Sequence, residues 1–275
     1  CEYFSRDIFF WDDAAGVAAV ISPADAGQVA AVLAEAVSQG LPVAIRGGGM
    51  SYTGGYVATQ PATVLLDLGR LNAVRELNRE DQYLTVEAGA TWEYVSTALA
   101  GTGLQTAIKG PYSGSVSTVG GALSQGVVDE MTGVLSLEVA LTDGSLVRTG
   151  SAARCDQPSP FFRNFGPDLT GLFIGDGGTL GAKTAATLAL EPVPAAKQHA
   201  SFAFESFAAI TRAMIGCAQL RLPSRIMGLD PKKSQNAPRV GFKSAIETVA
   251  KVALAGNKLA GGLRDAFAMA AAGRN

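Results

Sequence analysis

Apolar residues recur at helical spacing in one early stretch of the chain, with short apolar runs on either side of it. The helical stretch runs from Val29 to Val37 and is predicted to end at Gly40. The segment 22–25, Ser-Pro-Ala-Asp, predicts the start of this helix, with the serine as N-cap and the proline at the first helical position. The apolar runs at 16–21 and 42–45 predict flanking strands. We expect a strand–helix–strand unit with a parallel pairing of its strands.

Further strands and one helix follow up to residue 190. Few residues separate successive strands, which favours antiparallel neighbours, and Asp143-Gly144 predicts a two-residue hairpin turn. A helix is predicted to begin at the cap residue Thr91 and to end at Leu99, before Gly101. The predicted strands are 63–68, 74–77, 83–87, 135–141, 146–149 and 182–190.

A proline-rich stretch at 192–194 is the best candidate for a domain boundary. It divides the chain into residues 1–195 and 196–275. Beyond it, the pattern predicts a strand at 200–204, a helix at 207–218 and alanine-rich helices over 242–272. The basic residues of the last stretch leave two alternatives open, a helix with a solvated face and a helix lying on a membrane surface.

Charge and composition exclude several classes of protein. The 275 residues include 24 acidic and 22 basic side chains without a concentrated basic cluster, which argues against nucleic-acid binding. No apolar run is long enough to span a membrane. Three scattered cysteines and a single histidine, His199, argue against a disulfide framework and a metal site. We expect a cytoplasmic protein, with attachment to the inner face of a membrane as the alternative.

The 33 glycines gather in three clusters, at 46–55, 110–126 and 171–181. The first cluster follows a predicted buried strand, and consecutive glycines let backbone N–H groups converge on an anion such as a pyrophosphate. A flexible turn is the alternative. No segment matches the GxxxxGK[ST] pattern. The segment nearest to GxGxxG, Gly175 to Leu180, ends in leucine where the pattern needs a glycine. A phosphate site would therefore belong to another fold.

The second cluster places Ser117 and Thr118 directly before paired glycines, at a helix predicted to start near Val119. Hydroxyl donors beside a bare backbone suit a close approach to a cofactor. A capped helix start with a glycine packing contact is the alternative.

The segments 46–55, 117–121, 137–150 and 171–190, in this order and spacing, resemble the FAD-binding domain of the vanillyl-alcohol oxidase / p-cresol methylhydroxylase (PCMH-type) flavoprotein family. Within that family the chain is similar to bacterial FAD-linked oxidases related to glycolate oxidase and D-lactate dehydrogenase. The resemblance implies an α+β fold. Two α+β subdomains would hold FAD between them over 1–195, and 196–275 would form an incomplete cap, or substrate, domain.

The resemblance also implies which residues bind FAD. The first loop would wrap the pyrophosphate, the second would run beside the flavin, and 181–184 would reach the adenosine half through backbone groups. Met50 stands where some relatives carry a histidine bonded to the cofactor, so FAD would be held non-covalently at this position. The implied set is Arg46, Gly47, Gly48, Gly49, Met50, Ser51, Gly54, Gly55, Pro111, Ser117, Thr118, Gly120, Gly121, Ser124, Gln125, Gly126, Gly181, Lys183 and Thr184.

The functional hypothesis is an FAD-dependent oxidoreductase that oxidises a small hydroxy acid or alcohol by hydride transfer to flavin N5. The electron acceptor and the acid–base residues are not specified by the sequence. Two alternatives stay open. One is an FAD-binding module without turnover of its own, which needs a second chain or a missing C-terminal part; the other is a non-flavin phosphate or sugar binder.

Overall fold

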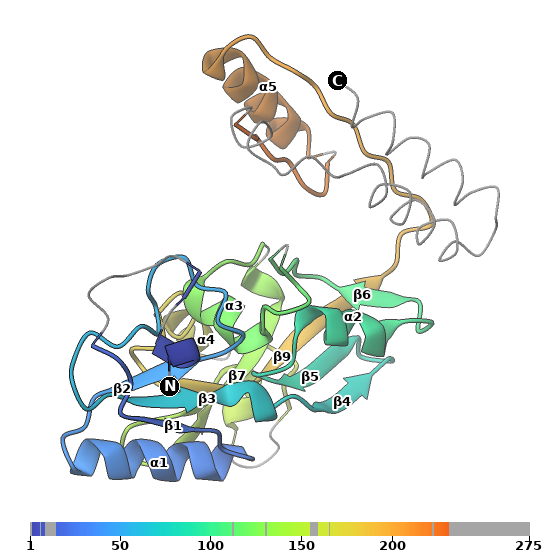
Figure 1. Ribbon diagram of the computed structural model, residues 1–275. Coiled ribbons are helices and arrows are strands. Elements are labelled where there is room, and N and C mark those ends of the chain that lie inside the picture. Colours follow the sequence, from blue (N-terminus) through green and yellow to red (C-terminus); the bar gives the residue numbers. More distant parts are fainter. Residues whose placement is uncertain are drawn as a thin grey trace, which may run out of the picture. The chain divides into compact units, whose positions relative to one another are not determined.

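The computed structural model describes residues 2–5, 7–8, 15–111, 113–129, 131–154, 159–164, 166–221 and 223–230. The chain forms two compact units, Cys1–Lys197 and Gln198–Asn275. The first unit contains two sheets with helices packed on them (Figure 1). This division falls close to the proline-rich stretch, whereas the assignment of 1–195 and 196–275 to a cofactor domain and a cap stays a prediction.

The smaller sheet has three parallel strands, β1 (Ala19–Ile21), β2 (Val43–Arg46) and β3 (Val64–Asp67). Their order is β1-β3-β2, so the two strands that flank the first helix do not pair with each other as predicted. The prediction that β3 is antiparallel to its neighbours was also wrong. Leu65 and Leu66 point to opposite faces of the sheet and both are fully buried, which explains why this strand takes the central place.

Helix α1 (Ala26–Ser38) begins later than predicted. Its N-cap is Asp25, whose carboxylate accepts a hydrogen bond from Gln28 N at 2.8 Å. The Gln28 side chain in turn accepts one at 2.9 Å from the N–H of Ala24, the residue before the N-cap, which resembles the reciprocal bonding of a capping box. These two hydrogen bonds fix the helix start at Asp25, so the prediction of Ser22 as the N-cap was wrong. The helix ends before Gly40, which has a φ of +66°.

The larger sheet is antiparallel, in the order β4-β5-β9-β7-β8. Its strands are β4 (Val74–Asn78), β5 (Tyr83–Glu87), β7 (Val134–Ala140), β8 (Leu146–Arg148) and β9 (Ala182–Pro192), and β6 (Leu104–Thr106) pairs with the far end of β9. The predicted β7–β8 hairpin is present. Its loop is longer than two residues, because Ala140 pairs with Leu146.

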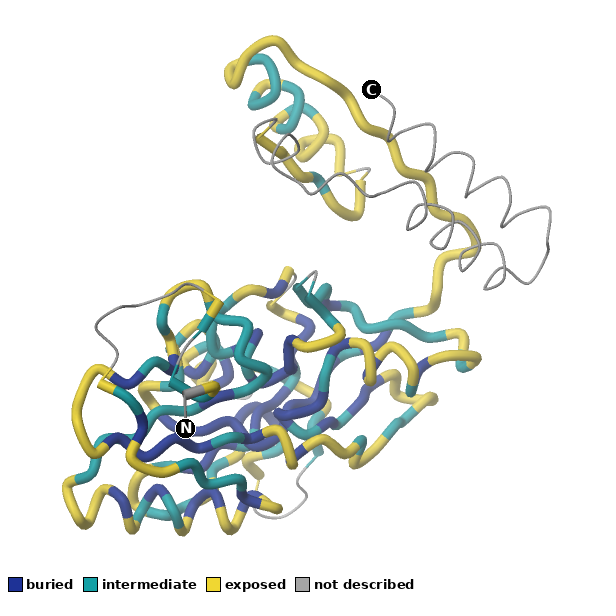
Figure 2. Tube along the Cα trace, viewed as in Figure 1, coloured by how far each residue is buried: buried dark blue, intermediate teal, exposed yellow. Residues whose placement is uncertain are grey.

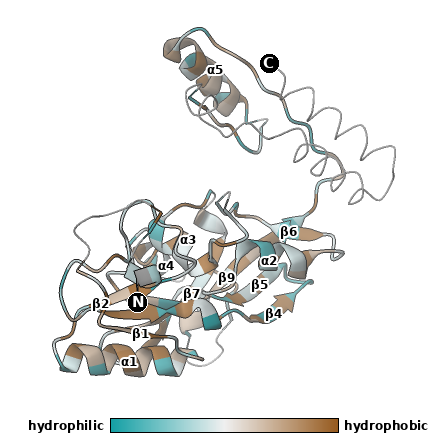
Figure 3. Ribbon diagram, viewed as in Figure 1, coloured by the Kyte–Doolittle hydropathy of each residue, from teal (hydrophilic) through white to brown (hydrophobic). Residues whose placement is uncertain are grey.

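Short helices complete the first unit. Helix α2 (Trp92–Leu99) has Thr91 as its N-cap, as predicted. The others are α3 (Val119–Gln125), α4 (Leu169–Leu172) and the 3₁₀ turns η1 (Glu2–Ser5), η2 (Leu68–Arg70), η3 (Met131–Gly133) and η4 (Gly150–Ala153). Burial follows the strands of both sheets and the inner face of α1 (Figure 2), where hydrophobic residues also concentrate (Figure 3).

The described part of the second unit holds helix α5 (Phe207–Leu220), capped by Ser206, close to its predicted range. None of its residues is buried. The predicted strand at 200–204 is irregular, and no described strand lies beside it to supply hydrogen bonds. The predicted helices at 242–272 lie outside the described residues. Among the described helices, none is both long and apolar enough to cross a membrane.

Candidate functional site

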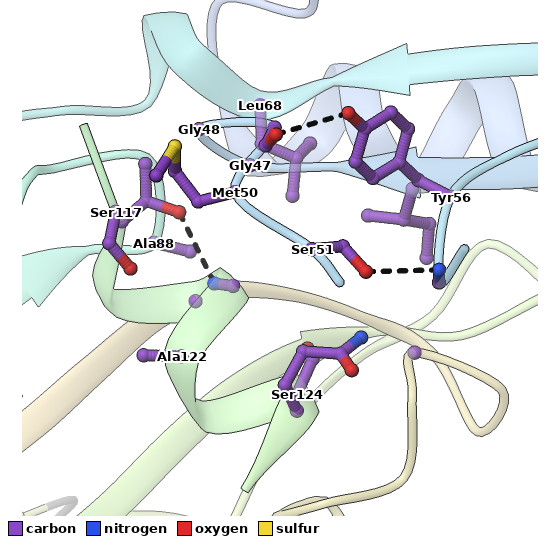
Figure 4. A pocket seen from close by; sticks show the side chains of 18 of the residues that line it. Gly47, Gly48, Met50, Ser51, Tyr56, Leu68, Ala88, Ser117, Ala122 and Ser124 are labelled. Carbon is purple, nitrogen blue, oxygen red and sulfur yellow. Dashed lines mark hydrogen bonds between the residues drawn. The ribbon is translucent and has the colours of Figure 1, made fainter. Parts of the chain in front are cut away.

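A cleft forms in the first unit where the loop after β2 faces helix α3 and the loop before β9 (Figure 4). Its lining is mostly backbone and small side chains. The lining residues are Ile45, Gly47, Gly48, Gly49, Met50, Ser51, Gly55, Tyr56, Leu68, Ala88, Ser117, Thr118, Gly120, Gly121, Ala122, Ser124, Gln125, Val127, Gly177, Gly178 and Lys183.

The loop after β2 touches the loop before α3 backbone to backbone. A Cβ at Gly48 would lie 1.8 Å from the carbonyl oxygen of Val116, and a Cβ at Gly47 would lie 2.2 Å from Thr118 Oγ1. Any side chain at either position would force the two loops apart. Glycine is required here by this close approach.

The backbone N–H groups of residues 48–51 donate no hydrogen bond to any described residue. Such groups normally find a partner when they leave water. Successive amides without partners, in a loop that lines a cleft, suit an anionic ligand. This is the local chemistry expected of a diphosphate site.

Arg46 does not line the cleft but lies behind the loop that does. Its side chain is buried, and the guanidinium contacts Tyr3 Oη at 3.2 Å and Asp67 Oδ1 at 3.5 Å. The rings of Tyr3, Phe4 and Tyr56 surround it, with centroids 5.0–5.6 Å from Cζ. Cation–π contacts of this kind stabilise a desolvated guanidinium. Arg46 therefore packs against the side of the loop that faces away from the cleft and stabilises it there.

Side-chain hydroxyls hold the shape of the loop itself. Tyr56 donates a hydrogen bond to the carbonyl oxygen of Gly49 at 3.1 Å, and burial raises the pKa of Tyr56, so this donor keeps its proton. Ser51 Oγ accepts hydrogen bonds from the backbone N–H groups of Thr53 and Gly55, and the bond to Gly55 is drawn in Figure 4. The loop is thus held in one conformation by its own side chains.

Helix α3 provides the facing side of the cleft. Thr118 caps it, with Oγ1 accepting a hydrogen bond from Gly121 N at 3.2 Å. Gly120 N donates to Ala88 O at 2.7 Å, and a Cβ at Gly120 would lie 2.6 Å from the Ala88 side chain. The paired glycines therefore let the helix start lie directly on the residues after β5.

The third glycine cluster packs against the end of α3. Gly175 N donates to Leu123 O and Gly177 N donates to Ser124 O, both at 2.8 Å. Gly126 has a φ of +66°, and a Cβ there would approach Gly175 Cα to 3.3 Å. The three clusters, separated by more than 120 residues of sequence between Gly47 and Gly177, thus meet at one cleft.

A buried ion pair lies at the inner end of the third cluster. Lys183 Nζ is 2.6 Å from Asp176 Oδ1, and each side chain is only 2% exposed. Burial lowers the pKa of Lys183, and the charge and hydrogen bond of Asp176 oppose this shift.

Of the residues that the resemblance implied, thirteen line the cleft: Gly47, Gly48, Gly49, Met50, Ser51, Gly55, Ser117, Thr118, Gly120, Gly121, Ser124, Gln125 and Lys183. The other six lie outside its lining: Arg46, Gly54, Pro111, Gly126, Gly181 and Thr184. Gly54 N binds Asp7 Oδ2 at 2.7 Å, and Thr184 Oγ1 binds Glu138 Oε1 at 3.0 Å.

Eight lining residues were not among those implied: Ile45, Tyr56, Leu68, Ala88, Ala122, Val127, Gly177 and Gly178. Gly177 and Gly178 belong to the third glycine cluster, so the cluster itself was the signal for them. The apolar members come from strand ends and turns that only tertiary packing brings to the cleft.

The cleft has a volume of about 80 Å³. Pockets that enclose a drug-sized ligand measure roughly 300–1,000 Å³. The residues present therefore fit the diphosphate part of FAD, and the remainder of a bound dinucleotide would extend beyond this cleft.

The cleft lies between a parallel and an antiparallel sheet, is lined by glycines and offers backbone amides without partners among the described residues. The sequence carries neither the GxxxxGK[ST] nor the GxGxxG pattern. Together these features define an α+β domain that binds a phosphate-containing cofactor. Residues 17–150 match the family model described as "FAD binding domain". Over that region the chain carries an FAD-binding domain of this family, and its cofactor is FAD, which favours this ligand over the non-flavin phosphate or sugar left open above.

The curated relatives include the glycolate oxidase subunit GlcD of Bacillus subtilis (strain 168), 31% identical over 190 residues, covering 66% of this chain and 38% of the relative. A probable mitochondrial D-lactate dehydrogenase of Danio rerio is 31% identical over 217 residues, covering 77% and 43%. The chain thus spans about two fifths of the length of these relatives.

Among solved structures, alkyldihydroxyacetonephosphate synthase matches with a TM-score of 0.60 at 18% identity, covering 86% of this chain and 47% of that one. A second structure of a protein of that name gives a TM-score of 0.57 at 19% identity, covering 74% and 37%. These matches confirm the α+β fold of the PCMH-type FAD-binding domain.

Proposed function

We propose that this chain provides the FAD-binding part of an oxidoreductase that oxidises a small hydroxy acid. The observation that carries the proposal is the cleft itself, in which three glycine clusters leave the amides of residues 48–51 without partners among the described residues. The substrate class is supported by the names of the relatives, which act on glycolate and D-lactate.

In this proposal the chain binds and orients the cofactor. The amides of 48–51 hold the diphosphate, and the 117–121 and 177–178 loops enclose it from the other side. FAD supplies hydride acceptance at the flavin when bound. The small residues of the lining exclude water from the diphosphate without contributing acid–base groups of their own. The nineteen residues implied above remain the proposed set for the cofactor.

The second candidate is an FAD-binding module without turnover of its own. The described lining of the cleft contains no carboxylate and no imidazole. Its remaining acid–base groups are already engaged, because Lys183 is paired with Asp176 and the raised pKa of Tyr56 keeps its hydroxyl protonated, so neither is a free base for a substrate hydroxyl. In this reading a second chain or a further C-terminal part completes the enzyme. The word "subunit" in the name of the glycolate oxidase relative is in line with it.

One series of spectra separates the two candidates. The purified chain is incubated with FAD, passed through gel filtration and examined for flavin absorbance, then mixed anaerobically with glycolate, D-lactate and a panel of alcohols. Retained flavin that a hydroxy acid bleaches supports the oxidoreductase. Retained flavin that no compound bleaches supports the module. A protein that stays colourless after incubation with FAD would contradict both candidate functions.

The same proposal includes a cytoplasmic location, with attachment to the inner face of a membrane as the alternative. It includes an electron acceptor for the reduced flavin, whose identity the sequence does not specify. The domain limits 1–195 and 196–275 belong to it as well. Cell fractionation tests the location: the chain should remain in the supernatant after ultracentrifugation, or leave the membrane pellet on a salt wash.

A further inference from the structure

Lys183 reaches the cleft through its side chain. It lies on β9, where it pairs with Val139 in the β7–β9 ladder, so its backbone belongs to the sheet. The residue nevertheless lines the cleft, and its side chain is 2% exposed. The resemblance gave this segment a role through backbone groups, which leaves the ammonium group unaccounted for.

A buried lysine is costly and needs compensation. Desolvation of two ions in a protein interior often outweighs their mutual attraction, so a buried pair is weak evidence for a stabilising role. Fully buried lysines are rare unless they are paired. The pair of Lys183 and Asp176 at 2.6 Å is therefore better explained by a function in the cleft than by stability.

Asp176 is fully engaged, whereas Lys183 is not. The Asp176 carboxylate accepts hydrogen bonds from Gly178 N at 3.0 Å, Leu180 N at 3.4 Å and Lys183 Nζ. An ammonium group carries three donors, and among the described residues only Asp176 accepts from this one. Two donors of Lys183 are thus left for a ligand in the cleft.

The charge of the cleft points to the ligand atoms concerned. Lys183 is the one charged side chain among the described lining residues. It shares a space of about 80 Å³ with the amides of residues 48–51. A cation and several free amides around one small space match the oxygens of a diphosphate, since charged hydrogen bonds to such oxygens are strong.

We propose that Lys183 binds the diphosphate of FAD through its ammonium group, with Asp176 as the positioning residue that holds this group and the 176–180 turn in place. The inference rests on the proposed FAD site and adds a side-chain contact to it. Lys183 would then be a determinant of cofactor affinity that acts from the antiparallel sheet, opposite the loop after β2.

The test measures dissociation constants of FAD and of ADP, by flavin fluorescence and by calorimetry, for the full chain and for Lys183→Met. A lost charged hydrogen bond corresponds to a weakening of about 10- to 100-fold, and FAD and ADP should lose the same factor. Unchanged FAD affinity in the variant would overturn the proposal. A loss for FAD without a loss for ADP would place the contact on the flavin half, and would overturn the assignment to the diphosphate.

Two further variants keep the result interpretable. Lys183→Met leaves Asp176 buried and unpaired, so the double variant Lys183→Met/Asp176→Asn, which removes both charges, is measured beside it; wild-type affinity in that protein would also count against the proposal. Arg163→Met breaks an ion pair with Asp168 (3.0 Å) outside the cleft and should lower stability at unchanged FAD affinity.

The outcome for the wild-type chain separates this inference from the proposed function. A wild-type chain that binds neither FAD nor ADP overturns both together. A wild-type chain that binds FAD, beside a Lys183→Met variant that binds it equally tightly, overturns the inference alone.

Discussion

The two walls of the cleft are both rich in glycine, yet different interactions hold them. The parallel-sheet wall is the loop 47–55, and behind it Arg46 makes polar contacts of 3.2–3.5 Å within a cage of aromatic rings. The antiparallel-sheet wall comprises 116–125 and 175–183, and it is held by backbone hydrogen bonds of 2.8 Å and an ion pair of 2.6 Å.

This difference follows from what each wall has to do. In the proposed site the amides of the parallel-sheet wall bind the ligand. The loop is held instead by side chains, with Arg46 behind it and the hydroxyls of Ser51 and Tyr56 bonded to its backbone. In the antiparallel-sheet wall, Gly175 and Gly177 donate their backbone N–H groups to carbonyl oxygens at the end of α3, and these bonds hold the two glycines directly. A ligand-binding backbone can therefore be ordered either by side chains packed behind it or by main-chain hydrogen bonds.

The largest expected effect comes from forcing the walls apart. In Gly48→Ala the new methyl group would lie 1.8 Å from a backbone carbonyl oxygen that cannot rotate away. We expect at least about 3 kcal/mol of destabilisation, the upper range for overpacking, and no measurable FAD binding. Urea denaturation and flavin fluorescence measure the two.

The control for this variant is Gly216→Ala. Gly216 lies inside helix α5, and apart from the nearby backbone of that helix no described atom lies within 4 Å of the position that an added methyl group would take, so alanine should stabilise the helix by up to about 1 kcal/mol. A Gly48→Ala protein as stable as wild type would show that the two walls do not meet as described.

The second prediction concerns the ion pair of the antiparallel-sheet wall. Asp176→Ala leaves the ammonium group of Lys183 buried without its partner, and it removes the acceptor for Gly178 N. Breaking a buried pair on one side costs about 3–5 kcal/mol. Thermal unfolding should show this loss, and the double variant Asp176→Ala/Lys183→Met should recover part of it. A single variant that unfolds like wild type would mean that the pair is solvated in solution.

The sequence predicted the local elements of both walls but not how they meet. Thr91, Gly40 and the long apolar run of β9 carry their structural signal within a few residues, and those elements formed. The central place of β3 depends on which strand buries both of its faces, which is a property of the whole sheet. The position of Arg46 behind its loop likewise depends on the ring of Tyr3, 43 residues away in the sequence, and on the ring of Tyr56 at the far end of the loop.

The third prediction tests the aromatic cage of the parallel-sheet wall. Arg46→Lys keeps the positive charge but removes the planar group that lies among three rings. The loss should be about 1–2 kcal/mol, because stacking and the forked hydrogen bonds disappear while the charge opposite Asp67 remains. FAD affinity should fall several-fold through a looser loop. Arg70→Lys, on the surface with one bond to Ser22 O, is the matched control and should change neither quantity.

The smallest expected effect is a pH-dependent change in stability at Glu138, in the sheet beneath the antiparallel-sheet wall. Burial raises the pKa of Glu138, but the hydrogen bonds and charges of Arg75, together with Thr184 and Arg148, outweigh burial and hold it below its usual value of 4.5. A carboxyl group whose pKa is lower in the folded state stabilises the fold above its unfolded pKa. That contribution declines as the pH falls from about 4.5 through the folded pKa.

Glu138→Gln should therefore be less stable than wild type at pH 7, and the difference should shrink as the pH falls below 4.5, as followed by urea denaturation at a series of pH values. Because Glu138 binds Thr184 on β9, the lost interactions belong to the sheet beneath the antiparallel-sheet wall. A difference between variant and wild type that stays constant from pH 7 to pH 3 would show that this carboxylate contributes nothing through its charge, and that the wall relies on its backbone bonds and on Asp176 alone.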